Sequence, residues 1–368
     1  MELEFTDEQD DMRASVRAVL ERECPVALVR EVVEKGTRAD RLWAQLVELG
    51  WPALTVPEAA GGLGLGFVEL AVVLEELGRV VAPVPYLATV TQFAPLVREA
   101  GDPEQQARFL GPVATGALTG ALVATGVLAR RDGGGWRLQG SAASVLDGTT
   151  ADELAVVASI AEADGTGLFV VPARDVTATP IEALDASRPL ATITVDTAVE
   201  PDRVLGRPGA VDAARRRALE EATVAVAVEM LGTCQAMFDI VLDYAKEREQ
   251  FGVPIGSFQA IKHKLADMLV ALEKARATAY FAAATIAEHD DRRTLAASMA
   301  KAAAGDCQRL VAQEGIQILG GIGYTWEHDM HLYVKRAKTG DALFGTGRHH
   351  RGVVADLIGL AAQAEPSL

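Results

Sequence analysis

The stretch of residues 213–251 constrains the fold more strongly than any other part of the sequence. Its pattern is helical, but its apolar side chains fall on most faces of the helix rather than on one stripe. They include Val224, Val226, Val228, Met230, Leu231, Met237, Phe238 and Ile240. A helix that is apolar all round has to be buried by its neighbours. We therefore expect a long core helix that other elements of the chain surround.

Helical patterns also fill both ends of the chain. Residues 261–289 and 294–319 resemble two further long helices, and long helices with short connections favour an antiparallel bundle. Near the start, apolar residues recur at helical spacing in residues 68–77, and Gly78 follows them. Residues 1–112 are therefore predicted to form a helical domain.

The middle of the chain has a different pattern, in which short segments rich in Val, Thr and Ile are separated by turn residues. These segments are residues 118–127, 136–139, 154–160, 168–172 and 190–195. The last of them alternates apolar and polar residues, as a half-buried strand does. The pattern predicts a small antiparallel β-domain.

The predicted fold class is therefore α+β and multidomain. It consists of an N-terminal helical domain (residues 1–112), a middle antiparallel β-domain (113–205) and a C-terminal four-helix bundle (206–368). At 368 residues, the chain is long enough for two or three such domains.

Charge and cysteine usage exclude several classes of protein. The chain has 51 acidic and 35 basic residues, a net charge of −16, which argues against general binding of nucleic acid or of an anionic membrane. Cys24, Cys234 and Cys307 lie far apart and are expected to be buried thiols in a reducing compartment. No metal-ligand spacing, secretion signal or membrane-length apolar run is recognised, so a cytoplasmic protein without a metal is expected.

Two C-terminal motifs carry a resemblance to a known family. Residues 244–252 read Tyr-Ala-Lys-Glu-Arg-Glu-Gln-Phe-Gly, and residues 317–324 read Gln-Ile-Leu-Gly-Gly-Ile-Gly-Tyr. Val-Pro-Glu-Ala-Ala-Gly-Gly at 56–62 and Glu-Leu-Ala-Val-Val-Leu-Glu-Glu-Leu-Gly at 69–78 add to it. Over nearly its whole length the chain resembles the acyl-CoA dehydrogenases, strongly at both ends and weakly in the β-domain.

This resemblance implies a flavoenzyme. In the family, FAD takes a hydride from Cβ of an acyl-CoA thioester while a carboxylate removes the α-proton, and the product is a trans-2-enoyl-CoA. The electrons leave through an electron-transfer flavoprotein. Because an α-proton beside a thioester is only weakly acidic, the reaction needs a positioned base and hydrogen bonds to the carbonyl oxygen, whereas the hydride chemistry belongs to the flavin.

The resemblance also implies residues that hold FAD across a dimer interface. The family's Arg-x-x-Phe and Gln-x-x-x-Gly elements hold the ADP part of the neighbouring subunit's FAD. Here the matching residues are Arg248, Gln250, Phe251, Gln317, Gly320 and Gly321, and Gln259 matches a further FAD position. An Arg can pair with a pyrophosphate, and glycine lets the backbone approach it closely. The alternative for Arg248 is a solvated charge at a helix end.

The part of the family pattern beside the isoalloxazine is damaged in this chain. The family's Thr-Glu-Pro-x-Ala-Gly-Ser-Asp segment corresponds to residues 124–132, where only Thr125 is kept as a cofactor residue. The family's Trp-Ile-Thr-Asn-Gly corresponds to residues 144–148, so that Ser144 replaces the tryptophan and Leu146 the threonine.

The catalytic base is missing from both positions that the family uses. The Tyr-Glu-Gly-Thr sequence corresponds to Leu343-Phe-Gly-Thr346, which puts Phe344 at the base position and keeps Thr346 as a cofactor residue. The second family position, on the core helix, falls on Ala222. Glu221 and Glu220 are the candidate bases next to it, although one residue is about 100° of helix rotation. The alternative is that both are surface carboxylates near a helix start.

This asymmetry suggests a hetero-oligomer, because a homo-oligomer would need both halves of the FAD site. This pattern resembles that of some bacterial acyl-CoA dehydrogenases, including those that act on steroid side-chain thioesters. Those enzymes are α2β2 assemblies in which one subunit carries the base. We expect this chain to be one subunit of such an enzyme, in a dimer or tetramer with a homologous subunit. Two alternatives are a structural subunit without turnover and a flavin-dependent monooxygenase, which needs no α-proton base. Residues 349–351 (His-His-Arg) follow Arg348, and we expect them to form a basic surface cluster at a helix start; contact with a CoA or FAD phosphate is the alternative.

Overall fold

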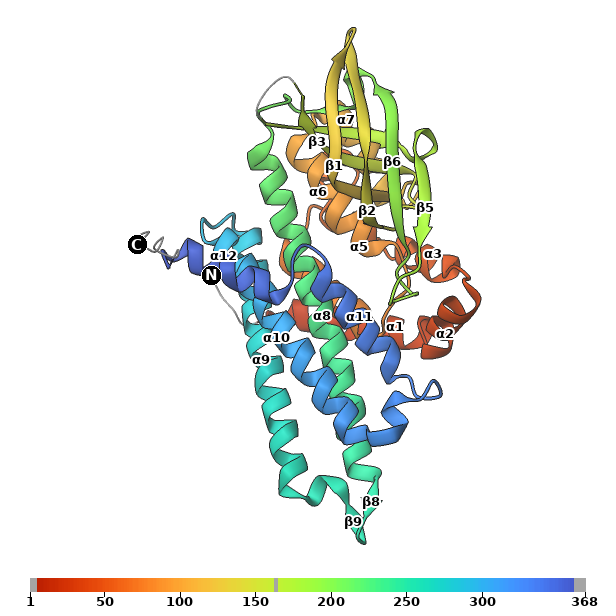
Figure 1. Cartoon of the computed structure of the whole chain (residues 1–368), viewed down its shortest axis with the longest axis vertical. Coiled ribbons are helices and arrows are strands. Elements are labelled where there is room, and N and C mark those ends of the chain that lie inside the picture. Colours follow the sequence, from red (N-terminus) through yellow and green to blue (C-terminus); the bar gives the residue numbers. More distant parts are fainter. Residues whose placement is uncertain (1–4, 162–164, 361–368) are drawn as a thin grey trace, which may run out of the picture.

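The computed structural model describes residues 5–161 and 165–360. Residues 1–4, the start of the stretch in which no secretion signal is recognised, lie outside the described residues. The chain begins with a layer of helices, as predicted (Figure 1). These are α1 (Asp7–Glu23), α2 (Val26–Lys35), α3 (Asp40–Glu48), α4 (Phe67–Arg79), α5 (Tyr86–Ala88), α6 (Ala94–Ala100) and α7 (Pro103–Ala114).

A seven-stranded sheet follows. Its strands are β1 (Gly120–Asp132), β2 (Gly135–Leu146), β3 (Glu153–Ile160), β4 (Thr166–Pro172), β5 (Thr177–Ile181), β6 (Leu190–Val199) and β7 (Val204–Leu205), in the order β5-β6-β2-β1-β3-β4-β7. The prediction of a wholly antiparallel sheet is wrong at one place, because β1 and β3 pair in parallel. The chain leaves β2 on one side of β1 and crosses to its other side, where β3 runs in the same direction as β1.

The C-terminal part is helical, as predicted. It consists of α8 (Asp212–Glu247), the small hairpin β8 (Glu249–Gln250) and β9 (Val253–Pro254), then α9 (Gln259–Ala287), α10 (Arg293–Leu319), α11 (Met330–Ala342) and α12 (Gly347–Leu357). In Figure 1, α8 runs from the sheet through the middle of the molecule to the hairpin. Among the described residues, α8 alone is long and apolar enough to cross a membrane, but 83% of its apolar window is buried inside the protein. It is the predicted core helix.

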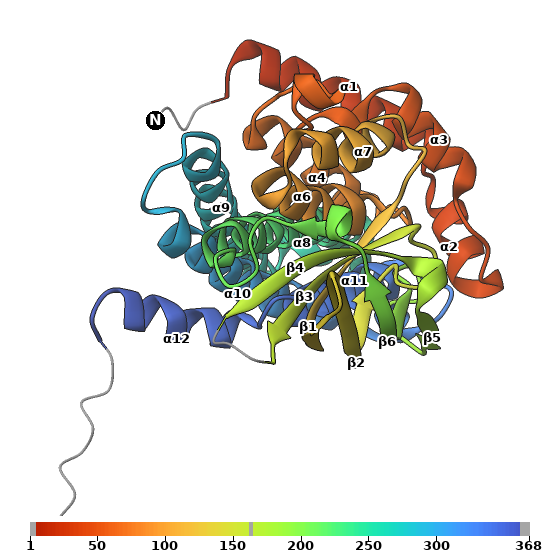
Figure 2. The same cartoon turned by 90° about the horizontal axis from the view of Figure 1, so that it is seen from above.

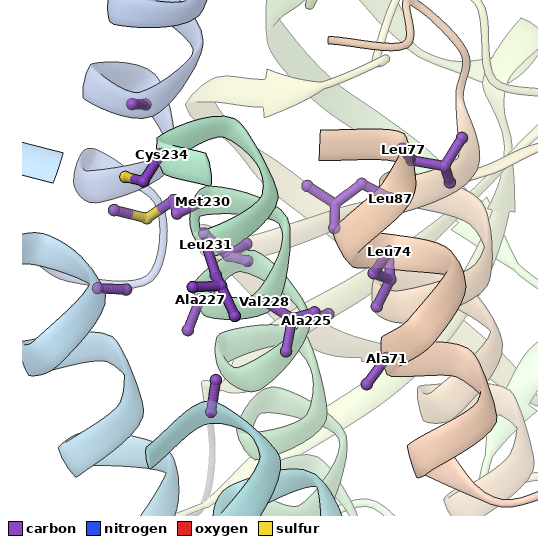
Figure 3. Packing of buried hydrophobic residues seen from close by; sticks show 14 of the residues in the cluster. Ala71, Leu74, Leu77, Leu87, Ala225, Ala227, Val228, Met230, Leu231 and Cys234 are labelled. Carbon is purple, nitrogen blue, oxygen red and sulfur yellow. The ribbon is translucent and has the colours of Figure 1, made fainter. Parts of the chain in front are cut away.

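Helix α4 packs closely on α8, and Figure 3 shows Ala71 and Leu74 on the side of α4 that faces α8. The contact is close because glycine lies at both crossing points. A Cβ on Gly232 would lie 1.8 Å from the carbonyl oxygen of Glu75, and a Cβ on Gly78 would lie 2.1 Å from that of Glu229. Helix α4 continues past Gly78 to Arg79, and Gly78 serves the packing of α4 on α8.

The N-terminal helices also cover one face of the sheet (Figure 2). Apolar side chains around α6 and α7, including Phe93, Val97 and Phe109, form one cluster with Leu122 and Val170 of the sheet. As a result, the three parts of the chain meet around the upper half of α8, and the lower half of the bundle extends away from the sheet.

Candidate functional site

The residues predicted to hold a neighbour's cofactor lie at the end of the bundle away from the sheet (Figure 1). Arg248 follows the last turn of α8, and Gln250 and Phe251 belong to the hairpin. All three are exposed, and the Phe251 side chain is 93% exposed on a backbone with φ of 55°. Gln259, the first residue of α9, is exposed as well. The structure therefore places these side chains where a second molecule can reach them.

The second predicted element lies at the C-terminal end of α10. Gln317 is exposed on the last turn of that helix, and Gly320 and Gly321 open the 3-10 turn η7 (Gly320–Tyr324). Gly320 has a φ of 67°, and a Cβ built on either glycine would meet no atom within 4 Å. Bare, open backbone, an exposed guanidinium and an exposed aromatic ring at this end of the bundle suit the pyrophosphate and adenine of a dinucleotide. The residues present therefore fit half of an FAD site.

The loop between α11 and α12 holds the predicted base position in a fixed conformation. Phe344 is half-buried with a φ of 54°, and Gly345 follows with a φ of 98°. The buried Lys301 donates hydrogen bonds to the carbonyl oxygens of Asp341 at 2.8 Å and Gly345 at 2.7 Å. Burial lowers the pKa of the Lys301 amine to about 8. A phenyl ring at position 344 cannot accept a proton, so this loop has no base.

The expectation of a surface cluster at 349–351 is confirmed for His349 and Arg351, which are exposed, and is wrong for the residue between them. His350 is buried, and its two ring nitrogens lie 2.9 Å from the Phe344 carbonyl oxygen and 3.3 Å from the Ser298 hydroxyl. Burial lowers the pKa of this histidine. Thr346 is exposed and caps α12 by accepting a hydrogen bond from the His349 amide. The sequence pattern missed His350 because its partners come from the preceding loop and from α10.

The β-domain residues of the predicted flavin side lie at two irregularities of neighbouring strands. The pairing of β1 with β3 shifts register between Val123 and Val127, and Thr125 lies exposed within this shift. The pairing of β2 with β6 shifts between Ala142 and Val145, and Ser144 lies there with a φ of 60°. Thr125 is thus on a strand bulge, because β1 continues without the long loop of the family pattern.

Both candidate bases are buried and paired, which corrects the alternative that they are surface carboxylates. Both oxygens of Glu221 accept hydrogen bonds from Arg98 at 2.6 Å. Burial alone lowers the pKa of Arg98, but Glu221 raises it above its ordinary value. Glu220 lies 2.7 Å from the guanidinium of Arg293 and accepts a hydrogen bond from Thr294 at 2.5 Å. The role of Glu220 and Glu221 as base stays a prediction, with both carboxylates already engaged.

Sequence reasoning missed a charged centre where the three parts of the chain meet. Arg336 of α11, 3% exposed, donates to Asp185 at 2.7 Å, to Glu229 at 3.0 Å and to Ser187 at 2.8 Å. Glu229 of α8 is also paired with Arg188. These residues come from segments more than 40 positions apart, and no local sequence motif indicates that they pair. Their mutual pairing ties α8, α11 and the β5–β6 connection together.

Comparison with family models gives two matches. Residues 6–117 match the acyl-CoA dehydrogenase N-terminal domain, and residues 212–359 match the acyl-CoA dehydrogenase C-terminal domain. The residues between these matches form most of the sheet.

The chain is similar to characterised proteins along most of its length. It is 34% identical to the acyl-CoA dehydrogenase IpdE2 of Mycobacterium tuberculosis over 90% of this chain and 91% of that one. It is 30% identical to the bovine mitochondrial short-chain specific acyl-CoA dehydrogenase over 84% and 80% of the two chains.

Two solved structures that are similar to this chain are each named for two proteins. The ChsE4–ChsE5 complex of M. tuberculosis has a TM-score of 0.90 and 27% identity, over 98% of this chain and 100% of that one. The Tcur3481–Tcur3483 steroid ACAD has a TM-score of 0.87 and 31% identity, over 97% and 99%.

Proposed function

The chain belongs to the acyl-CoA dehydrogenase family, whose members depend on FAD, and we infer from its geometry that it works as one subunit of a hetero-oligomeric acyl-CoA dehydrogenase. In this proposal it completes the FAD site of a homologous partner subunit, and the partner carries the catalytic base. The complex oxidises an acyl-CoA between Cα and Cβ to a trans-2-enoyl-CoA and passes the electrons to an electron-transfer flavoprotein.

One contrast carries the proposal. The residues that would serve a neighbour's FAD are present and exposed, among them Arg248 and Phe251. By contrast, Phe344 and Ala222 stand at the two positions that would hold the base for the chain's own flavin. Two of the similar structures, each named for two proteins, support a pairing of unlike subunits.

The residues of this chain have defined tasks in such a complex. Arg248 would pair with the pyrophosphate, Phe251 would pack on the adenine side, and the backbone at Gly320 would approach the phosphates. FAD supplies the hydride acceptor when it is bound. Lys301 would keep the Phe344–Gly345 loop in place, so that a backbone N–H of this loop could face an acceptor without any proton transfer. None of these tasks removes an α-proton.

The test is to co-express the chain with a homologous subunit from the same organism that carries the family's glutamate. We expect replacement of that glutamate by Gln in the partner to abolish turnover of butyryl-CoA and steroid side-chain CoA thioesters with an electron-transfer flavoprotein. A residual turnover near half of the unmodified complex would mean that this chain has a base of its own, and it would overturn the proposal. Replacing Glu221 in this chain by Gln is the matched control.

A further inference from the structure

A cavity of about 370 Å³ lies where the N-terminal helices, the end of β2, α8 and α11 meet. Most of its surface is apolar and comes from the N-terminal helices, with Trp43, Leu74, Leu77, Tyr86 and Leu87 among the lining residues. Figure 3 shows two of them, Leu74 and Leu87, on the side of α4 and α5 that faces α8. The volume falls within the range of small-molecule sites in proteins.

One end of this cavity is polar, and it contains a buried donor without a partner. Glu229 uses one oxygen for Arg336 and the other for Nη2 of Arg188. Arg188 is 4% exposed, and its Nη1 has no hydrogen-bond partner within the described residues. A buried guanidinium N–H without a partner costs free energy, because water no longer solvates it. This N–H is therefore an open position for an acceptor.

Asp147 lies in the same lining and is 6% exposed at the end of β2. Its backbone, with φ of 54°, is fixed by a hydrogen bond from its amide to the Pro189 carbonyl oxygen at 2.9 Å. Within residues 5–161 and 165–360, no group forms a hydrogen bond or salt bridge with its carboxyl group. Burial raises the pKa of this carboxyl to about 7 against the opposing effect of the nearby arginines. Asp147 can thus accept or donate a hydrogen bond near neutral pH.

The charged groups around Asp147 come from every element that surrounds it. They are Arg188 of the β5–β6 connection, Arg336 of α11, Arg38 of the α2–α3 link and Glu229 of α8. A ligand carboxylate would face Asp147 and Glu229, and a ligand ammonium would face Arg188 and Arg336. A neutral oxygen avoids both conflicts. A hydroxyl can accept from Arg188 and donate to ionised Asp147, whereas a ketone can accept from both Arg188 and protonated Asp147.

We propose that this cavity binds an apolar molecule with one hydroxyl or keto oxygen, and that the oxygen lies between Arg188 and Asp147. None of the residues assigned to FAD lines the cavity. Two lining residues, Leu146 and Asp147, come from residues 144–148, the segment that corresponds to the family's motif beside the flavin. Because the proposal uses none of the residues assigned to FAD, it does not depend on the proposed function.

The test uses four rigid probes of one size: adamantan-1-ol, adamantan-2-one, adamantane-1-carboxylate and 1-aminoadamantane. Binding to the full-length chain is measured by titration calorimetry at pH 6. We expect the alcohol and the ketone to bind at least tenfold more tightly than the two charged probes. Equal affinities, tighter binding of a charged probe, or no binding of any probe would overturn the proposal.

Two tryptophan variants locate the binding. Ala186 is exposed and lines the cavity, so Ala186→Trp should cover the opening without disturbing the core and weaken binding of the alcohol and ketone at least tenfold. Ala198, exposed on β6 and outside the cavity lining, gives the matched control Ala198→Trp, with unchanged binding. Unchanged binding in Ala186→Trp would place the probes elsewhere and contradict the proposal.

The role of Asp147 has its own signature. Affinity for the ketone should fall as the pH rises from 6 to 8, since the ketone needs the carboxyl proton, whereas affinity for the alcohol should change less. Asp147→Asn keeps the side-chain volume, tolerates positive φ and always offers an N–H donor. Its affinity for the ketone should therefore lose the pH dependence. The same pH profile in the wild type and in the variant would remove Asp147 from the site.

Discussion

The end of the helical bundle and the charged centre use the same kinds of side chain in opposite ways. At the bundle end, the Arg248 guanidinium and the Phe251 ring lie in solvent. In the centre, Arg336 is buried, and all of its hydrogen-bonding nitrogens are satisfied by Asp185, Glu229, Ser187 and backbone carbonyls. An exposed aromatic ring on strained backbone contributes little to the stability of its own chain. The centre therefore holds distant segments of this chain together, whereas the bundle end leaves its side chains available, as our proposal of a partner's FAD site requires.

The largest expected effect is on stability, at the centre. Arg336→Met removes the cation between Asp185 and Glu229 and leaves two buried carboxylates without it, so the free energy of unfolding should fall by about 4 kcal/mol. Urea denaturation measures the change. Arg137→Met, which breaks the exposed pair with Asp196, is the control and should cost less than about 1 kcal/mol. Equal losses in the two variants would mean that the centre does not organise the fold.

The next effect has the opposite sign and depends on pH. Because burial raises the pKa of Asp147 to about 7, the folded protein holds a proton that the unfolded chain has lost between about pH 4 and 7. This group therefore contributes stability below pH 4 that is lost as the pH rises through 7. The Asp147→Asn variant has no carboxyl group to titrate at this position, so its free energy of unfolding does not fall for this reason as the pH rises. At pH 8 it should be more stable than the wild type by up to about 4 kcal/mol. Denaturation curves that differ equally at pH 4 and pH 8 would contradict this.

A somewhat smaller effect is expected at the start of α8. Glu221→Gln weakens the pair with Arg98 and should lower the free energy of unfolding by about 3 kcal/mol, with turnover of the partner complex unchanged at a temperature where the variant is folded. Glu247→Gln, exposed on the last turn of α8, is the control. If turnover disappears and stability does not change, Glu221 is the base, and the comparison between the two regions fails.

The smallest effect on stability is expected at the bundle end. Arg248→Ala should change the free energy of unfolding by less than about 0.5 kcal/mol, because the side chain is exposed. In the partner complex it should weaken FAD binding at least tenfold, as expected for loss of a charge-assisted hydrogen bond. Lys246→Ala, two residues earlier and also exposed, should leave FAD binding intact. Equal FAD affinity in both variants would remove Arg248 from the cofactor site.

The helices were largely predictable from the sequence because their signals are local. The apolar run of 213–251 became α8 (Asp212–Glu247), and the run 261–289 became α9 (Gln259–Ala287). The sheet was less predictable from the sequence. The short edge strand β5 (Thr177–Ile181) contains a proline and was missed, and the parallel pairing of β1 with β3 depends on a crossover that no strand pattern encodes.

The residues of the functional site also differ in how well the sequence predicts them. Arg248 and the glycines at 320–321 lie in motifs that could be recognised, and the structure adds that they are exposed. By contrast, Glu221 looked like a surface carboxylate, because its partner Arg98 is 123 positions away in the chain. The Arg188–Glu229–Arg336 centre depends on three-dimensional packing of distant segments, and a single sequence does not reveal such pairings.

The visible absorption spectrum, with the FAD content per chain, tests the central claim most directly. It should be recorded for the chain alone and for its complex with a homologous subunit, before and after addition of a panel of acyl-CoA thioesters. We predict that the chain alone is colourless or keeps flavin that no thioester bleaches, and that the complex holds one FAD for each pair of chains and is bleached. One FAD bound per chain in the isolated protein, bleached by a thioester, would show a complete site and contradict the account.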